Sequence, residues 1–322
     1  MVPRFSVDPD RIQANRRRNT RHAVVLIAAM VMLVVAVGWF FAGPYGLIWI
    51  AVLAAVMFMI GPRLSQRVML QLYAASPLTR RQVPLLYELT DALRDRLELR
   101  QKVRLFYIPS RLMLAFTIGG RDEVSVAVSD GLMRGLTGRE LSGVLAHELS
   151  HVANGDLRLM ALADFITKAT RAMALVAMLL IAINLPYMME EEIAIPWPPI
   201  MLLAIAPMVS LLLQLGLSRA REYDADASAA YLTGDPGGIA SALQKMEAQQ
   251  HRHWEAVLGR SGTAKEPSLL RTHPDTQERV RQLGEMAVPR DEDLPDIPDD
   301  LEPPGEGPVR RKPGRKLHGF RY

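Results

Sequence analysis

The sequence contains no cysteine and only seven histidines among its 322 residues. The lack of cysteine excludes disulfides, thiolate nucleophiles and zinc sites with cysteine ligands. A metal ion held by this chain must therefore be bound by His, Asp, Glu or water. The formal net charge is only +4, and because the charges are segregated along the chain it indicates no class of partner. We expect no nucleic-acid partner.

Charge is also missing from four long apolar stretches, which are residues 23–42, 45–60, 172–189 and 197–217. About 20 apolar residues cross roughly 30 Å of hydrocarbon, so we interpret the runs as two transmembrane hairpins. The alternatives are a cleaved signal peptide for the first run and a buried soluble hairpin for the last two. The immediate second run disfavours the former, and the length and lack of charge disfavour the latter.

Basic residues flank these four runs on one side only. Lys and Arg precede the first run, follow the second, precede the third at Lys168 and Arg171, and follow the fourth at Arg219 and Arg221. The connection between the last two runs instead carries three glutamates, at 190–192. The positive-inside rule then predicts a multi-pass protein of the cell (inner) membrane, with both termini and all soluble segments in the cytoplasm.

The middle of the chain carries an H-E-x-x-H pattern, formed by His147, Glu148 and His151. Thr137 and Glu140 have the spacing of a capping box just before it, and apolar residues then recur at helical spacing. On a helix, two histidines four residues apart lie on one face and can bind one metal ion. The alternative is a pair of ordinary histidines on a surface helix.

A catalytic zinc ion needs one more protein ligand. Glu222 and Asp226 follow the fourth apolar run and are four residues apart, so a helix places both on one face. Glu222 is the candidate ligand, and Asp226 would accept a hydrogen bond from the outer nitrogen of a ligand histidine. Asp156 and Asp224 are rival carboxylates, and an acidic helix face paired with neighbouring arginines is the alternative without metal.

Three motifs, in order along the chain, resemble those of the HtpX-like membrane metalloproteases, which are related to the CAAX prenyl proteases. They are His147-Glu148-Leu149-Ser150-His151 with Asn154-Gly155-Asp156, Ser218-Arg219-x-x-Glu222-x-x-Ala225-Asp226, and Arg271-Thr272-His273-Pro274. The resemblance covers residues 23–285. It implies that Glu222 is the third zinc ligand, that Asp226 supports the ligands, and that damaged or misassembled membrane proteins are the substrates. Leu114 departs from the pattern, since many members carry asparagine there.

The expected chemistry is peptide hydrolysis with one Zn²⁺ per chain. Glu148 would take a proton from a water at the zinc ion, whose pKa the metal lowers towards about 7, and pass it to the leaving amine. His273 or Arg271 would stabilise the developing oxyanion, although Asp275 and Glu278 also give this stretch the form of a helix start. Asp156 is a further candidate to support the ligands.

We expect an α+β, mostly helical chain with four transmembrane helices and a cytoplasmic zincin-like metallopeptidase domain. Residues 83–97 are predicted as a helix, and 103–108 and 124–128 as strands of a small sheet. Substrate would pair with the exposed edge of that sheet, along Val124, Val126 and Val128. The predicted divisions are 1–22 (basic tail), 23–62 (hairpin), 63–171 (first catalytic segment), 172–217 (hairpin), 218–287 (second catalytic segment) and 288–322 (disordered tail).

The function that we infer is cleavage of misfolded or damaged membrane proteins, with protein substrates and the lipid bilayer as partners. Other membrane quality-control proteases are candidate partners. Two alternatives remain open, which are a CAAX-type prenyl protease and a non-catalytic zinc-binding membrane scaffold. A transporter is disfavoured because no charged residue lies within the four runs.

Overall fold

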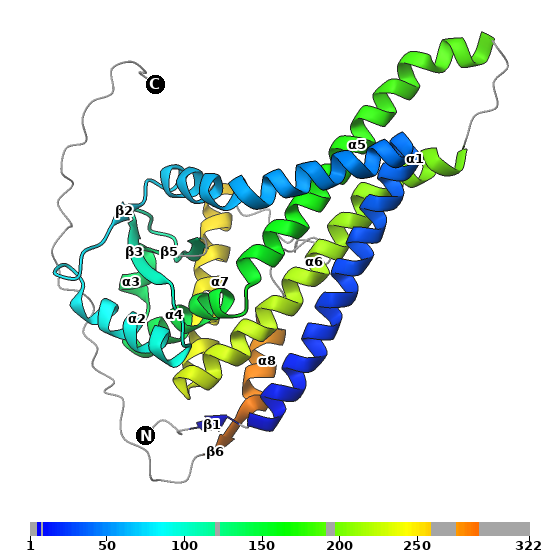
Figure 1. Ribbon diagram of the computed structural model, residues 1–322. Helices are drawn as coiled ribbons and strands as arrows, with labels where there is room; N and C mark the ends of the chain where they lie inside the picture. Colours follow the sequence, from blue (N-terminus) through cyan, green and yellow to red (C-terminus); the bar gives the residue numbers. More distant parts are fainter. Residues whose placement is uncertain (1–4, 8, 120–122, 191–196, 259–274, 290–322) are drawn as a thin grey trace, which may run out of the picture.

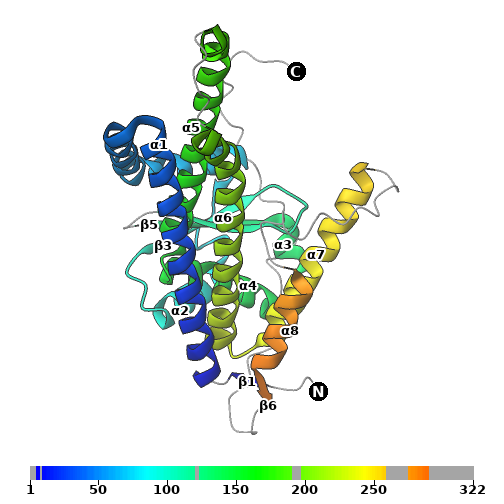
Figure 2. The ribbon, with the colours of Figure 1, turned by 90° about the vertical axis from the view of Figure 1, so that its right-hand side faces the viewer.

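The computed structural model describes residues 5–7, 9–119, 123–190, 197–258 and 275–289. The chain is mostly helical with a small mixed sheet, which confirms the predicted α+β class. Three long helices, α1 (Pro9–Leu72), α5 (Asp156–Glu190) and α6 (Trp197–Thr233), pack together beside a smaller α+β unit, as Figure 1 shows. Figure 2 shows α7 (Pro236–Leu258) and α8 (Thr276–Met286) on the other side of α6 from α1.

The four-stranded sheet has the order β2-β3-β5-β4. Its strands are β2 (Ser76–Pro77), β3 (Lys102–Ile108), β4 (Ala115–Gly119) and β5 (Glu123–Ser129). Strand β5 pairs parallel with β3 and antiparallel with β4. The predicted helix at 83–97 is α2 (Pro84–Arg96), while β2 and β4 were not predicted. A separate ribbon pairs β1 (Phe5–Val7) with β6 (Ala287–Pro289).

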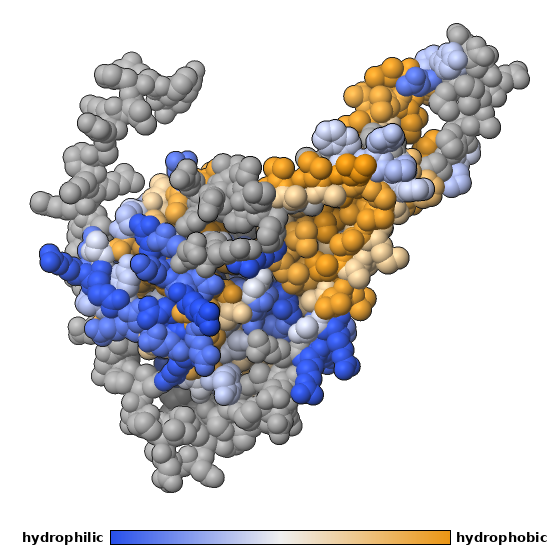
Figure 3. Space-filling view, in the orientation of Figure 1, coloured by the Kyte–Doolittle hydropathy of each residue, from blue (hydrophilic) through white to orange (hydrophobic). Residues whose placement is uncertain are grey.

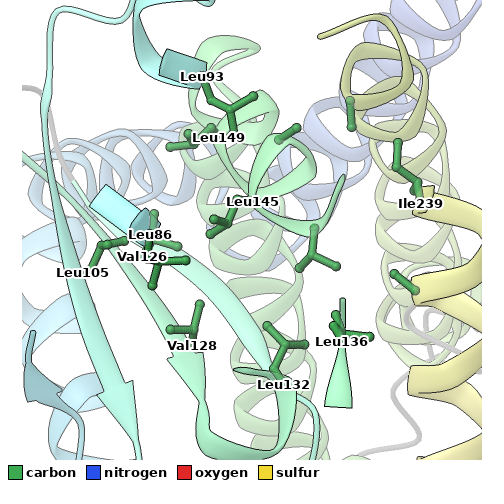
Figure 4. Packing of buried hydrophobic residues seen from close by; sticks show 14 of the residues in the cluster. Leu86, Leu93, Leu105, Val126, Val128, Leu132, Leu136, Leu145, Leu149 and Ile239 are labelled. Atoms are coloured by element: carbon green, nitrogen blue, oxygen red, sulfur yellow. The ribbon is translucent and has the colours of Figure 1, made fainter. Parts of the chain in front are cut away.

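Helix α4 (Gly138–Ala153) carries the His-Glu-x-x-His motif and packs on one face of the sheet. Leu145 and Leu149 are fully buried there, against strand residues such as Val126, as Figure 4 shows. Burying one such leucine contributes about 1.5–3 kcal/mol. Because the leucines and the histidines occupy different faces of α4, packing on the sheet turns His147 and His151 towards α6.

The opposite face of the sheet is covered by the end of α1. Tyr73, which follows α1, packs its ring 5.0 Å from that of Phe116 on β4. Phe106 and Ala127 belong to the same apolar cluster. The long N-terminal helix is therefore fixed to the back of the strand pair that faces the motif helix.

The predicted capping box is present at the start of α4, after the short helix α3 (Asp130–Gly135). Thr137 accepts a hydrogen bond from the backbone N–H of Glu140, and the Glu140 carboxylate accepts one from the backbone N–H of Thr137. Glu140 also accepts hydrogen bonds from Ser241 at 2.6 Å and Lys245 at 2.7 Å, both on α7. A single buried carboxylate thus caps α4 and attaches α7 to it.

Three helical stretches among the described residues are long and apolar enough to cross a membrane. They are Arg17–Phe40, Asp156–Tyr187 and Ile200–Thr233. Figure 3 shows an apolar surface over the upper part of these helices and polar residues over the α+β unit and the lower end of α1. The first, third and fourth predicted runs therefore have the length and composition of spans.

The second predicted run differs from the expected antiparallel hairpin. Helix α1 continues through it without ending, and turns at Gly43, whose φ of 54° is the left-handed conformation that glycine adopts readily. Figure 1 shows the later part of α1 running away from the upper end of the first part, at an angle to it. Only Gly43–Val52 of this run appears as a shorter apolar helix, and the side chains of 57–67 lie outside the described residues.

Two boundaries differ from the predicted divisions. The basic tail 1–22 is helical from Pro9 onwards, because it continues into the first apolar run without a break. The first catalytic segment, predicted to end at 171, passes into α5 at Asp156, directly after the motif helix, because Gly155 forms a turn with φ of 73° between the two helices. The predicted disordered tail was 288–322, but Val288 and Pro289 belong to β6, and 290–322 lie outside the described residues.

We expect Glu140→Gln to lower the thermal unfolding midpoint of the detergent-solubilised chain by several degrees at pH 7. Burial raises the pKa of Glu140, but the hydrogen bonds from Lys245, Ser241 and Thr137 outweigh burial and hold this pKa below its usual range. A carboxylate with a lowered folded-state pKa contributes stability above its unfolded pKa and loses it as the pH falls through the folded value. The difference in unfolding midpoint between wild type and variant should therefore become smaller below about pH 4.3.

The matched control is Glu88→Gln, which changes an exposed glutamate on α2. Its unfolding midpoint should stay within about a degree of the wild type, because surface changes rarely exceed ±0.5 kcal/mol. An equal midpoint for Glu140→Gln and Glu88→Gln at pH 7 would contradict the role of Glu140 in joining α4 to α7.

Candidate metal centre and its supports

Three side chains from two helices converge on one point beside α4. The Nε2 atoms of His147 and His151 are 3.2 Å apart. Glu222 of α6 places Oε2 at 3.5 Å from the first nitrogen and Oε1 at 3.6 Å from the second. Ligands of a tetrahedral zinc ion, bound at about 2.0–2.1 Å, lie about 3.3 Å from one another. The three side chains therefore fit a tetrahedral metal site and could hold such an ion.

Helix α6 delivers Glu222 because it does not end with its apolar run. It continues as one helix to Thr233 and passes beside α4. Glu222 is 7% exposed, and such a buried carboxylate requires partners. The fourth predicted run and the predicted third ligand are thus parts of a single rigid element.

Two charged residues, Asp226 and Arg279, lie on the side of His147 that faces away from the three-residue site. The Nδ1 atom of His147 lies 2.9 Å from Oδ1 of Asp226. Arg279 of α8 donates two hydrogen bonds of 2.6 Å to that aspartate, and its Nη1 atom lies 3.3 Å from Oε2 of Glu222. At this distance Asp226 is close enough to orient the imidazole of His147, and its role in supporting a metal ligand stays a prediction.

His151 has a parallel arrangement on its own side. Its Nδ1 atom is 2.9 Å from Oδ2 of Asp156, and Arg221 approaches the other oxygen of Asp156 at 3.3 Å. Arg221 also pairs with Asp224, which accepts a 2.7 Å hydrogen bond from Asn19 of α1. Each motif histidine is therefore backed by an aspartate, and each aspartate by a buried arginine.

The two rival carboxylates lie away from the metal-facing nitrogens. Asp156 contacts the outer nitrogen of His151, in the supporting position proposed for it. Asp224 is engaged with Arg221 and Asn19. Neither belongs to the group of three side chains that could hold a metal.

The electrostatics of the site favour a bound cation. Burial lowers the pKa of His147, but hydrogen bonds and charge interactions with Asp226 and Glu222 outweigh burial and raise this pKa to about 10. The carboxylates thus attract positive charge to the imidazole. A metal ion at the same point would replace that proton, because a ligand imidazole must be neutral.

Glu148, between the two histidines, is contacted by the sheet. Thr117 of β4 donates a 2.8 Å hydrogen bond from its hydroxyl to Oε2 of Glu148. The expected strand at Val124, Val126 and Val128 is β5, which lies between β3 and β4 and is no edge. All three valines are fully buried, so the prediction that they face substrate is wrong. Strand β4 lies between β3 and β5 in the sequence but at the edge of the described sheet. It was not predicted, because β-branched residues do not alternate regularly along residues 115–119.

His273 and Arg271 lie outside the described residues. Helix α8 follows them, and Asp275 caps it by accepting a 2.9 Å hydrogen bond from the backbone N–H of Gln277. Arg279 was missed from sequence. It shares one face of α8 with the buried Leu283 and Met286, and a charged residue in such a stripe signals a buried partner.

This geometry, on a chain with membrane-type helices, defines a class of protein, the membrane metallopeptidases. Residues 90–287 match the family model of "Peptidase family M48". A relative from Salinibacter ruber named "Protease HtpX homolog" is 31% identical, over 84% of this chain and 98% of its own length. One from Campylobacter concisus with the same name is 33% identical, over 81% and 94%.

The chain belongs to peptidase family M48, which confirms the resemblance seen in its motifs. The structure titled "Crystal Structure of S. mikatae Ste24p" matches with a TM-score of 0.47 at 18% identity, covering 87% of this chain and 67% of that one. Family membership makes the protein a membrane metalloprotease.

We expect Glu222→Ala to lose tight metal binding, because two histidines alone leave the ion without its third protein ligand. Elemental analysis of the purified chain after dialysis should find about one zinc ion per wild-type chain and far less in the variant. Glu278→Ala is the control, since it removes a partly exposed carboxylate of α8 that pairs with Arg281 and is not among the three side chains that could hold a metal. Full zinc content in Glu222→Ala would place the third ligand elsewhere.

Proposed function

We propose that this protein is a zinc-dependent endopeptidase that cleaves misfolded or damaged membrane proteins on the cytoplasmic side of the membrane. The observation that carries the proposal is the set of distances among His147, His151 and Glu222, with Glu148 fixed beside them. The ligand types also support zinc, which accepts two imidazoles and one carboxylate and leaves a fourth position open.

The residues of the site divide the work of hydrolysis. When bound, zinc supplies Lewis-acid polarisation and lowers the pKa of water to about 7. Glu148 takes the proton of the attacking water and delivers it to the leaving amine. Asp226 and Asp156 hold the two imidazoles in the tautomer that presents Nε2 to the metal. His273 or Arg271 remains our candidate for stabilising the oxyanion.

Substrate would bind in extended form along β4 in place of β5. Within the described part of the chain, β4 pairs with β5 on one side and with no strand on the other. An added strand would gain main-chain hydrogen bonds that are independent of the substrate side chains. This mode suits an enzyme whose substrates share an unfolded backbone and no common sequence.

The orientation follows from which end of the bundle holds the site. Arg17, Arg18 and Arg21 are exposed at the start of α1, and the neighbouring Asn19 contacts Asp224 beside the metal ligands. The basic end of the bundle is therefore the end that carries the site. The positive-inside rule supports a cytoplasmic position for both, where protein substrates and other quality-control proteases of the membrane would meet it.

We expect Glu148→Gln to keep its zinc and to lose casein cleavage by at least about 10²-fold, because general acid–base catalysis contributes roughly 10²–10⁴-fold. Glutamine retains the shape of the side chain and cannot accept the proton. The measurement pairs cleavage rates with elemental zinc content, and Glu88→Gln serves as the control for handling and folding. A fully active Glu148→Gln would contradict the mechanism, whereas a zinc-loaded wild type without cleavage would support the scaffold alternative.

Single introduced cysteines test on which side of the membrane the site lies. No other residue reacts as a thiol, because the chain has no cysteine. Tyr187→Cys lies near the far end of α5, where Tyr187 is 58% exposed, and Arg100→Cys lies on the surface of the α+β unit. A membrane-impermeant maleimide should label Tyr187→Cys in intact spheroplasts and Arg100→Cys only after lysis. The reverse pattern would place the site outside the cytoplasm.

A further inference from the structure

Thr117 occupies an unusual position, since it belongs to the edge strand and also touches the motif helix. Its hydroxyl donates the 2.8 Å hydrogen bond to Oε2 of Glu148, and the residue is 7% exposed. It lies opposite Val126 in the β4–β5 register, on the face of the sheet that carries α4. A strand residue therefore contacts the carboxylate that stands between the two metal-binding histidines.

The backbone N–H and C=O groups of Thr117 point away from β5. The backbone N–H of Ser129 donates to the carbonyl oxygen of Leu114, so this pair is hydrogen-bonded across β4 and β5. In an antiparallel ladder such pairs alternate with pairs whose N–H and C=O groups point outwards. Ala115 and Thr117 follow Leu114 by one and three residues, so their backbone groups point to the side of β4 that pairs with no described strand.

We propose that Thr117 is a positioning residue that holds Glu148 for proton transfer and couples this to the docking of a substrate strand. This proposal rests on the proposed peptidase function. A substrate strand paired with β4 would form hydrogen bonds with the main chain of Thr117, whose hydroxyl donates to Glu148. Docking then fixes the peptide carbonyl and the carboxylate relative to one common residue.

The chemistry of the contact supports this role. A glutamate side chain has several rotatable bonds, and holding one oxygen by a hydrogen bond from a strand restricts where the carboxylate lies. Oε2 is engaged by Thr117, which leaves Oε1 to accept the proton of the attacking water. Hydrogen bonds to charged groups are among the stronger ones in proteins, so loss of this bond should slow the chemical step about tenfold or more.

The test compares Thr117→Val with Thr117→Ser in the zinc-loaded, full-length chain. Valine keeps the shape and the strand preference and removes the hydroxyl, whereas serine keeps the hydroxyl. We expect Thr117→Val to lower kcat on a fluorogenic peptide at least about tenfold with little change in KM, and Thr117→Ser to stay within about threefold of wild type. An effect confined to kcat indicates an interaction needed for the chemical step.

Thr90→Val is the matched control. Thr90 is another buried threonine of the same unit, 1% exposed, and its hydroxyl donates to the carbonyl of Leu86 within α2. Thr90→Val should lower the stability about as much as Thr117→Val does, and it should leave kcat unchanged. Zinc content is measured for every variant, and each should retain the metal.

Each other outcome overturns the inference. A kcat equal to wild type in Thr117→Val excludes the positioning role, as do equal losses in the valine and serine variants or equal losses in Thr90→Val. These results stay distinct from failure of the proposed function. In that case the zinc-loaded wild type itself would not cleave the peptide, and Glu148→Gln would not differ from it.

Discussion

The pairing of buried charges around the motif histidines is the constraint on which the arrangement of the helices depends. Asp226 and Arg279 lie behind one histidine, and Asp156 and Arg221 lie behind the other. All four are at least 93% buried. Breaking such a pair leaves an uncompensated charge at a cost of about 3–5 kcal/mol, so α4, α5, α6 and α8 are held in one relative position.

This network also joins the membrane bundle to the α+β unit. Arg221 and Asp224 come from α6, and Asn19 extends the contacts to α1. With a rise of about 1.5 Å per residue, Glu222 lies roughly 8 Å along α6 from Leu217, the end of the predicted span. The site is therefore rigidly tied to the end of the bundle.

Local patterns in the sequence were sufficient for the motif helix, its capping box and the apolar runs, because helix periodicity and hydropathy depend only on near neighbours. They also singled out Glu222, Asp226 and Asp156. The partners of Arg279 and Asn19 could not be identified in this way, because helix periodicity shows which face a residue occupies but not which distant side chain covers that face. The sequence likewise predicted two separate helices where α1 continues and bends at Gly43.

The edge of the sheet shows most clearly why strand order cannot be taken from strand pattern. Strand β5 has the strongest β-type sequence, because a strand that is buried on both faces carries mostly apolar side chains. Strand β4 is only half-buried and, among the described residues, pairs with a strand on one side only, so its β-type pattern is weaker. The features that make a strand easy to predict are therefore weaker in a strand that pairs on one side only. A polar side chain such as Thr117 on an otherwise apolar sheet face is the better indicator, because its burial requires a partner, and here the partner is Glu148.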